Sequence, residues 1–486
     1  MPLYDLRSFV ELLDKDNELK TIHGAAREYE IGAISEVSVQ NDGPALLFDQ
    51  IPGYDPGYRV AVNVCSTKRR GQLVLGVDGD MPEEQAMQIF RDRWANFKPV
   101  LPQYVDDGPL YENVQMGDDV DLLQFPVPIW HEKDGGPYIG TGHTVINQDP
   151  DTGFINVGTY RVMLHDKNTT GIFAEPDSDG RKIMEKWWAQ GKACPVAVSF
   201  GPDPLLFLAG CSLSGVPKST SEFDYTGFLA QEPVPVVKGR ITGLPIPARS
   251  EIAIEGEVPP PSEETRMEGP FGEWTGYYEF APTPEPVIRV KALYYRNNPI
   301  LYGAPPTKHV THFAFPLRMR QITGFVSRFE RMEIPVRRVA DFRPLGAMVV
   351  TIEQQNPDDV TRLMDVLEQT QTPSRLIIVV DHDVDPDNPW DVLWAVGTRF
   401  DPELARVSVV DSDWLLNPLR EIKDRISRRP LDYKRMIING CRPFERLGDF
   451  PPVNWLSAEG RTKVWGKWDM EEWLPVKSRS NPGGRR

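Results

Sequence analysis

The chain has 486 residues, of which 40% are apolar and 26% are charged, as in an ordinary soluble globular protein of two or three domains. Its 54 basic and 70 acidic residues give a formal net charge of −16, which argues against a nucleic-acid-binding surface. The sequence contains neither the run of roughly 18 apolar residues that a membrane helix requires nor a readable signal peptide. We therefore expect a cytoplasmic protein with no membrane partner.

The first part of the chain alternates between helices and strands. Apolar residues spaced three and four apart predict helices over 3–15 and 84–97, and short β-rich runs lie between them at 45–49 and 58–64. This alternation predicts an N-terminal α/β domain over residues 1–115.

The middle of the chain, residues 116–310, is rich in strands. One helix, at about 179–190, interrupts them. The clearest predicted strands are 154–164, 196–200, 234–238, 252–258 and 287–295. Many short strands separated by turn residues predict a barrel or a sandwich.

Residues 325–486 return to an alternating pattern and predict a C-terminal α/β domain with a mainly parallel sheet. The predicted elements are strands at 347–352, 375–381 and 406–411 and helices at 357–369 and 389–397. No G-x-G-x-x-G follows a strand there, and the chain has no Walker A sequence, which argues against the dinucleotide- and nucleotide-binding domains that carry those motifs.

Other common catalytic patterns are missing from the sequence. It has no CxxC, HxH or HxxxH metal pair and no G-x-S-x-G nucleophile elbow. His309 and His312 lie three residues apart after two prolines, where a polar loop is the better interpretation for His309. For His312, a loop and a functional site stay equally open.

The segment Glu268-Gly-Pro-Phe-Gly-Glu273 is the strongest chemical signal in the chain. It places two carboxylates around a Gly-Pro bend and is followed by Trp-Thr-Gly-Tyr-Tyr. Aromatic surroundings would raise the pKa of at least one carboxyl group, and a protonated carboxyl near neutral pH can deliver a proton to a carbanion-like centre. Taken alone, both glutamates are more typical of a surface turn, and Arg161 on the strand beginning at 154 is more typical of a solvated edge.

Several motifs together resemble the UbiD-type decarboxylases, which use prenylated FMN. The most specific is the segment 268–277, Glu-Gly-Pro-Phe-Gly-Glu-Trp-Thr-Gly-Tyr. The others, in chain order, are Asp134-Gly-Gly-Pro-Tyr-Ile, Asn156-Val-Gly-Thr-Tyr-Arg161, Ser221-Glu-Phe-Asp-Tyr-Thr-Gly with Glu232-Pro-Val-Pro-Val-Val-Lys, and Asp391-Val-Leu-Trp-Ala-Val-Gly-Thr-Arg399. Because the resemblance covers nearly the whole chain, it implies that residues 116–310 form a split-barrel prenylated-FMN-binding domain.

The resemblance also implies catalytic roles. Arg161, Glu268 and Glu273 match a triad over the flavin, in which Glu273 donates the proton after carbon dioxide leaves. Arg161 would hold both glutamates, and Glu268 would complete the pair. Two carboxylates that share one guanidinium can be pushed apart in pKa, which fits these roles.

The expected cofactors are prenylated FMN, Mn²⁺ or a similar divalent cation, and K⁺. By resemblance, Asn156 and Glu232 are metal ligands, and Glu232 with residues 156–161 (Asn156, Val157, Gly158, Thr159, Tyr160 and Arg161) binds the cofactor. The small Gly158 would let the backbone approach the flavin. Many relatives have a histidine ligand eighteen residues after the arginine, where this chain has Asp179. Asp179 is either a third ligand or the N-cap of the following helix.

These features predict a carboxy-lyase that reversibly decarboxylates an aromatic, heteroaromatic or α,β-unsaturated acid. Trp274, Tyr277 and His312 are candidates for the substrate wall. The resemblance further implies a prenyl-flavin synthase that supplies the cofactor and a homodimer or homohexamer formed through the C-terminal domain. The alternatives are a decarboxylase of an aromatic acyl-thioester, for which the basic stretch 425–430 and nearby arginines could bind phosphates, and a catalytically silent flavin-binding assembly subunit.

Overall fold

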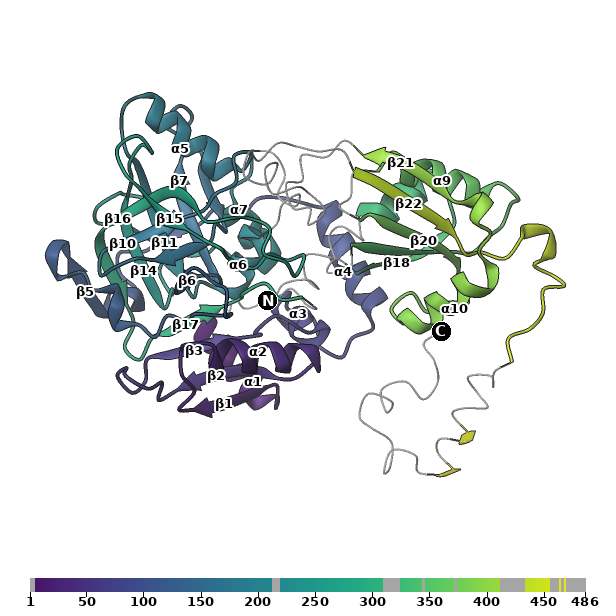
Figure 1. Ribbon diagram of the computed structural model, residues 1–486, viewed down its shortest axis with the longest axis horizontal. Helices are drawn as coiled ribbons and strands as arrows, with labels where there is room; N and C mark the ends of the chain where they lie inside the picture. Colours follow the sequence, from purple (N-terminus) through teal and green to yellow (C-terminus); the bar gives the residue numbers. More distant parts are fainter. Residues whose placement is uncertain are drawn as a thin grey trace. The chain divides into compact units, whose positions relative to one another are not determined.

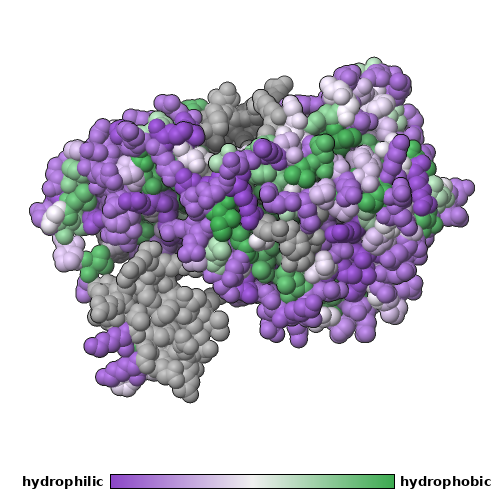
Figure 2. Space-filling model, turned by 180° about the vertical axis from the view of Figure 1, so that it is seen from behind, coloured by the Kyte–Doolittle hydropathy of each residue, from purple (hydrophilic) through white to green (hydrophobic). Residues whose placement is uncertain are grey.

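The structure is a computed structural model that describes residues 5–211, 219–308, 324–342, 346–370, 374–410, 433–454, 463–464 and 467–468. These residues form two compact units, one ending at Gly324 and the other beginning at Phe325. Figure 1 draws the first unit in purple to teal and the second in green to yellow. On the face shown in Figure 2, hydrophilic residues cover most of the described surface. No helix among the described residues is long and apolar enough to cross a membrane.

The N-terminal part of the first unit contains a four-stranded sheet with helices around it. The sheet has the order β1 (Leu19–His23), β2 (Ala45–Asp49), β3 (Arg59–Val62) and β17 (Ile300–Gly303). The helices are α1 (Leu6–Lys15), α2 (Glu30–Gln40), α3 (Lys68–Val74) and α4 (Glu83–Ala95). Asp5 caps α1 by accepting a hydrogen bond from the Ser8 amide, and α1 buries Leu6, Phe9 and Leu13 at helical spacing.

The central part of the first unit is an antiparallel sheet that curls into a half-barrel (Figure 1). Its main path runs β6 (Tyr138–Gly140), β9 (Val162–Leu164), β10 (Thr169–Ile172), β16 (Thr283–Tyr295), β14 (Ile252–Val258), β11 (Cys194–Phe200), β7 (His143–Gln148) and β8 (Ile155–Gly158). Strands β5 (Asn113–Met116) and β15 (Thr265–Glu268) also pair with β16. The expected barrel is therefore confirmed as a half-barrel, but the predicted strand 154–164 is two strands, β8 and β9, separated by residues 159–161.

Smaller elements complete the first unit. The helices α5 (Asp179–Ala189), α6 (Pro204–Gly210) and α7 (Glu222–Ala230) belong to the central part, as does a small sheet of β13 (Pro245–Pro247), β12 (Pro235–Lys238) and β4 (Gln103–Tyr104). Apolar side chains from β7, β8, α6 and α7 share one buried cluster with residues of α1 and α4, so the N-terminal and central parts have a common core.

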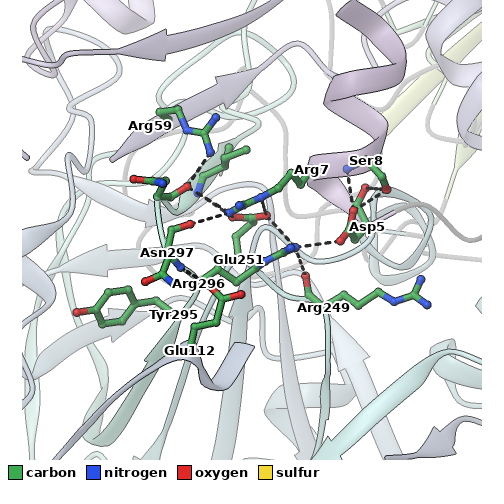
Figure 3. A network of polar contacts seen from close by, with 12 residues as sticks. Asp5, Arg7, Ser8, Arg59, Glu112, Arg249, Glu251, Tyr295, Arg296 and Asn297 are labelled. Carbon is green, nitrogen blue, oxygen red and sulfur yellow. Dashed lines mark hydrogen bonds and ion pairs between the residues drawn. The ribbon is translucent and has the colours of Figure 1, made fainter. Parts of the chain in front are cut away.

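A buried ion-pair network holds α1 against the half-barrel (Figure 3). Glu251 has no exposed surface and accepts a hydrogen bond of 2.7 Å from Arg7 Nη2. Arg296 Nη1 lies 3.3 Å from the other oxygen of Glu251 and 2.9 Å from Asp5 Oδ2. Because each buried charge faces an opposite charge, the network ties the start of the chain to residues nearly 300 positions away.

The second unit contains a five-stranded sheet with the order β18 (Val336–Phe342), β19 (Ala347–Ile352), β20 (Leu376–Asp381), β22 (Tyr433–Asn439) and β21 (Arg406–Val410). Strands β19, β20 and β22 are parallel, and the two edge strands are antiparallel to their neighbours. The helices α9 (Asp359–Glu368) and α10 (Pro389–Arg399) follow β19 and β20. The mainly parallel central sheet and both helices agree with the sequence-based prediction.

One predicted strand of the second unit has the wrong role. Residues 406–411 were expected to form a third buried parallel strand, but β21 pairs antiparallel with β22 at the edge of the sheet. Val407 and Val409 are 59% and 63% exposed, so this β-branched run does not indicate burial. The third parallel strand is β22, which comes later in the chain.

Candidate active site

Arg161 binds both glutamates of the Gly-Pro bend. Its Nε and Nη2 donate to Glu268 Oε1 and Oε2, each at 2.8 Å, and its Nη1 donates to Glu273 Oε1 at 2.5 Å. Arg161 lies between β8 and β9, Glu268 ends β15, and a cis peptide bond joins Gly269 to Pro270 in the bend that follows. The structure therefore brings Arg161 to two glutamates that lie more than 100 residues further along the chain.

Aromatic rings surround the Arg161 guanidinium. Its Cζ atom lies 3.9 Å from the centre of the Phe173 ring, 5.6 Å from that of Phe271 and 6.0 Å from that of Phe280. All three phenylalanines are buried. Such a shell lowers the local dielectric and strengthens the ion pairs, and the ring faces also attract the cation directly.

The two glutamates have different environments. The Glu268 side chain has no exposed surface, whereas that of Glu273 is 15% exposed. The pKa of Glu273 is raised to about 8, mainly by burial. The positive charge of Arg161 lowers this pKa, whereas the negative charges of Glu175, Glu279 and Glu268 raise it. The raised pKa favours the protonated form of Glu273 near neutral pH, and the side chain keeps an exposed edge, as a proton donor requires.

Glu268 has a further partner that the sequence motifs did not assign. The hydroxyl of Tyr138 donates a 2.8 Å hydrogen bond to Glu268 Oε1, and both residues are buried. The Tyr138 ring packs on Phe271, with ring centres 4.1 Å apart. The segment Asp134-Gly-Gly-Pro-Tyr138 was part of the family resemblance, but a hydrogen bond across 130 residues has no local signal in sequence.

A second polar cluster lies around Asn156 on β8. The Asn156 side chain is buried and donates to Asn147 Oδ1 at 3.0 Å, and the neighbouring Val157 amide donates to Glu222 Oε2 at 2.8 Å. Burial raises the pKa of Glu222 to about 7, and the negative charge of Asp179 raises it further. The structure therefore brings Asn156, Asp179 and Glu222 to one place.

Asp179 is not the N-cap of α5. Ser178 caps this helix by accepting a hydrogen bond from the Arg181 amide, and Asp179 is the first helical residue. The N-cap interpretation of Asp179 is therefore wrong, and its exposed carboxylate is free of that structural role. Among the described residues, no group of three or more His, Cys, Asp or Glu side chains is arranged to hold a metal ion, so any cation here would also need the amide oxygen of Asn156.

Glu232 lies near the other end of α7 from Glu222. The two residues are ten positions apart, at opposite ends of α7, whose nine residues span about 14 Å. The negative charge of Glu232 acts instead on Asp203, whose pKa is raised mainly by burial. The acidic residue beside Asn156 is thus Glu222. Its signal was present in the Ser221-Glu222 motif, where Ser221 caps α7 and Glu222 is the first residue of the helix.

The Tyr160 side chain packs closely against Gly158 and Gly180, which leaves no room for a Cβ atom at either position. A Cβ atom on Gly158 would lie 2.3 Å from the Tyr160 hydroxyl oxygen, and one on Gly180 would lie 2.4 Å from the ring. The Gly180 amide donates to the same hydroxyl at 3.0 Å. Gly158 therefore has a packing reason within the chain, in addition to any close approach of a ligand. Nearby, Thr159 donates to the His143 carbonyl oxygen.

The three candidates for the substrate wall have different positions. Trp274 is half-buried directly after Glu273. Tyr277 is 60% exposed, and its carbonyl oxygen accepts a hydrogen bond from the Glu273 amide at 3.0 Å. His312 and His309 lie outside the described residues.

Comparison with known proteins places this geometry in a family. Three sequence profiles match the chain, those of the N-terminal domain, the Rift-related domain and the C-terminal domain of 3-octaprenyl-4-hydroxybenzoate carboxy-lyase, at residues 10–89, 103–309 and 342–414. The chain belongs to the UbiD family. The enzyme class expected from the resemblance, a carboxy-lyase, is confirmed.

Similar UbiD-family proteins act on aromatic acids by name. A phenolic acid decarboxylase from Streptomyces sp. (strain D7) is 31% identical, with 82% of this chain and 85% of the relative aligned. A pyrrole-2-carboxylic acid decarboxylase from Pseudomonas aeruginosa is 36% identical over 63% of each chain. Among solved structures, Sedimentibacter hydroxybenzoicus vanillic acid decarboxylase in its open form has a TM-score of 0.79 and 26% identity over 97% of this chain and 99% of its own.

The fold also matches a structure determined with the expected cofactor. The UbiD-class enzyme HmfF from Pelotomaculum thermopropionicum, an evolved dimeric form in complex with prFMN, has a TM-score of 0.77 over 98% of this chain and 99% of its own. At 22% identity this likeness concerns the fold alone. The mixed α/β architecture with a curled half-barrel is therefore that of UbiD-class structures.

Proposed function

We propose that this protein reversibly and non-oxidatively decarboxylates an aromatic or heteroaromatic carboxylic acid, or an α,β-unsaturated one, on prenylated FMN, and that Glu273 is the proton donor. The observation that carries the proposal is the asymmetry of the pair bound by Arg161: Glu268 is sealed, whereas Glu273 keeps exposed surface and a raised pKa. Three similar proteins, named after phenolic, pyrrole-2-carboxylic and vanillic acids, support a planar conjugated substrate.

In the proposed reaction each triad residue has one task. Arg161 holds both carboxyl groups and stays charged: burial lowers its pKa, but the negative charges of Glu268 and Glu273 more than offset this and leave the pKa raised. Glu268 supplies the negative charge that balances Arg161. Glu273 holds a proton and passes it to the carbon atom that has lost carbon dioxide, and the aromatic shell keeps water away from that carbon.

The residues of the second cluster fit a divalent cation that would bind the cofactor phosphate. Asn156, Asp179 and Glu222 offer one amide and two carboxylate oxygens, the donor type that Mn²⁺ and similar hard cations prefer. The negative charge of Asp179 contributes to the raised pKa of Glu222, and a bound cation would offset this repulsion. When bound, prenylated FMN would supply the electron sink for carbon dioxide loss. We propose that residues 156–161 line its site, with Glu222 in place of Glu232 as ligand. A K⁺ ion stays an expectation from the resemblance.

The test is to produce the protein together with a prenyl-flavin synthase and Mn²⁺. Mass spectrometry should find prenylated FMN in the purified protein, and the protein should release carbon dioxide from pyrrole-2-carboxylate or vanillate. Exchange of labelled bicarbonate into the substrate would demonstrate reversibility. Protein that carries no prenylated FMN after such production would overturn the proposal.

The two alternatives have less support. A silent assembly subunit has no need for a buried triad with one accessible acid, so the Arg161 geometry favours an active enzyme. The basic stretch 425–430, on which an acyl-thioester substrate rested, lies outside the described residues. The division into domains 1–115, 116–310 and 325–486 and a homodimer or homohexamer formed by the last of these remain our predictions.

A further inference from the structure

We propose that Asn147 is a positioning residue that turns the amide oxygen of Asn156 toward the divalent cation of the second cluster. This inference rests on the proposed function, in which Asn156 is a ligand of that cation, and adds a residue that was not among the expected ligands. An asparagine side chain can face a cation with its oxygen or with its NH₂ group, and only the oxygen can bind a metal. The Asn156 amide therefore needs a fixed orientation.

Asn147 and Asn156 lie opposite each other on neighbouring strands. They are paired in the register of the antiparallel strands β7 and β8, so their side chains are on the same face of the sheet. Asn147 has no exposed surface, and Asn156 is 3% exposed. Asn156 Nδ2 donates to Asn147 Oδ1 at 3.0 Å. Because a buried amide without a hydrogen-bond partner costs free energy, the two side chains hold each other in one orientation.

The backbone of α5 determines which orientation this is. Asn147 Nδ2 donates to the Gly180 carbonyl oxygen at 3.0 Å. A carbonyl oxygen only accepts hydrogen bonds, so Asn147 must present its NH₂ group to Gly180 and its oxygen to Asn156. Asn156 must then present its own NH₂ group to Asn147. This arrangement leaves Asn156 Oδ1 as the atom available to a cation.

The Tyr160 hydroxyl supports the same orientation of Asn156. It accepts from Asn156 Nδ2 at 3.4 Å and from the Gly180 amide at 3.0 Å. The pKa of Tyr160 is raised to about 12, mainly by burial, and the negative charges of Glu222 and Asp179 contribute to the increase. This hydroxyl is therefore close to both carboxylates of the second cluster as well as to the Asn156 amide.

A further neighbour of Asn147 does not oppose this orientation. The Cys194 thiol hydrogen-bonds the Asn147 side chain, and burial raises the pKa of Cys194 to about 12, so the thiol stays neutral. A neutral thiol is a weak donor and a weak acceptor, and the Gly180 carbonyl oxygen outweighs it. The bond from Asn147 to Gly180 also ties the residue after Asp179 to β7, so an experiment must separate orientation of the amide from movement of α5.

The substitution Asn147→Leu removes the orienting amide and keeps a side chain of similar size and shape. It should weaken Mn²⁺ binding to the full-length protein by about tenfold, as does the usual loss of a residue that orients a metal ligand. Calorimetric titration with Mn²⁺, in the absence and in the presence of FMN, measures the effect. Asn113→Leu is a matched control, because Asn113 Nδ2 also donates to a backbone carbonyl oxygen, that of Tyr295, at 3.0 Å. The control should bind Mn²⁺ like the wild type.

A second background separates the orientation of the amide from a displacement of α5. In the Asn156→Asp background, both side-chain oxygens can bind a cation, so no particular orientation is required. There, Asn147→Leu should change the affinity for Mn²⁺ by less than about twofold, which is the usual deviation between uncoupled sites. A tenfold loss in this background as well would overturn the inference, because it would indicate that Asn147 acts only by holding Asp179 in place.

Tyr160→Phe serves as a second variant should Asn147→Leu fail to fold. It keeps the ring that packs between Gly158 and Gly180 and removes only one acceptor of Asn156 Nδ2. Mn²⁺ binding should weaken by about two- to tenfold, the range of one neutral hydrogen bond. In the Asn156→Asp background, this loss should shrink to less than about twofold.

The metal titrations separate this inference from the proposed function. If Asn147→Leu has the expected effects on Mn²⁺ affinity, but the protein produced with a prenyl-flavin synthase contains no prenylated FMN, the inference holds and the proposed function fails. If the wild type releases carbon dioxide but Asn147→Leu and Tyr160→Phe bind Mn²⁺ with wild-type affinity, the inference is overturned. A wild type that binds no Mn²⁺ with or without FMN would also overturn it.

Discussion

At the scale of single residues, burial distinguishes the glutamate that we propose as the acid from its partner. Glu268 and Glu273 bind the same guanidinium, and both flank the same bend. Glu268 is sealed under Arg161 and Tyr138, whereas Glu273 keeps an exposed edge and a pKa of about 8. A carboxyl group with a raised pKa and an exposed edge is what a proton donor near neutral pH requires.

Replacement of the acid should remove the proton transfer while the ion-pair partner remains. We expect Glu273→Gln to reduce carbon dioxide release by about 10²- to 10⁴-fold, the usual contribution of general acid catalysis. Glu263→Gln is the control, because Glu263 is an exposed residue paired with Arg289. Carbon dioxide release at the wild-type rate by Glu273→Gln would show that another group donates the proton.

The pH dependence follows from the same acid. Because Glu273 must be protonated and its pKa is about 8, kcat/KM should fall as the pH rises through about 8. The charge of Glu279 raises the pKa of Glu273, so Glu279→Gln should move this alkaline limb to lower pH. A pH profile of both proteins checks the sign. An upward shift would contradict the electrostatic explanation.

At the scale of elements, helix ends select the polar groups of the second cluster. Ser178 and Ser221 cap α5 and α7, and the residue after each cap, Asp179 or Glu222, comes next to Asn156. Glu232, beyond the other end of α7, is carried away by the length of the helix. A shift of one helix end therefore changes which acidic residue can bind a cation.

Two substitutions, one at the start of α7 and one beyond its end, distinguish the candidate ligands. We expect Glu222→Gln to weaken Mn²⁺ binding by at least about tenfold. Even the loss of a residue that only hydrogen-bonds a metal ligand lowers metal affinity by about that factor. Glu232→Gln should bind Mn²⁺ like the wild type. Calorimetric titration of the metal checks both. Weakened binding by Glu232→Gln alone would restore the ligand set expected from the sequence.

At the scale of the whole molecule, the first unit depends on contacts between distant parts of the chain. Glu251 holds Arg7 of α1 and Arg296 after β16, and β17 joins the N-terminal sheet by pairing with β3. The start of the chain is therefore needed to complete the unit that contains the triad. Such non-local contacts are formed only by the folded chain.

Removal of the central carboxylate of this network should destabilise the first unit. Glu251→Ala leaves Arg7 and Arg296 without their buried partner, at a cost of about 3–5 kcal/mol in the free energy of unfolding. In calorimetry, we expect the transition of the first unit to move to lower temperature while that of the second unit stays in place. The control is Glu263→Ala, which removes an exposed ion pair with Arg289. It should change the free energy of unfolding by less than about 1 kcal/mol.

The sequence alone determined the elements that depend on neighbouring residues. Helices near 84–97, 179–190 and 389–397 and the parallel strands 347–352 and 375–381 follow from apolar spacing, which is a local property. The Glu268–Glu273 segment predicted acid chemistry, since its two carboxyl groups lie within six residues around a Gly-Pro bend. The motifs also indicated the UbiD family and its arginine.

The tertiary structure decided everything that depends on distant residues. It paired β21 antiparallel at an edge, selected Glu222 over Glu232 beside Asn156, and gave Asp179 no capping role. It also supplied Tyr138, whose bond to Glu268 spans 130 positions. The physical reason is that burial and hydrogen-bond partners set a carboxyl pKa, and both are properties of the folded chain. The sequence places Glu268 and Glu273 at the same bend, and the fold gives their side chains different burial and different hydrogen-bond partners.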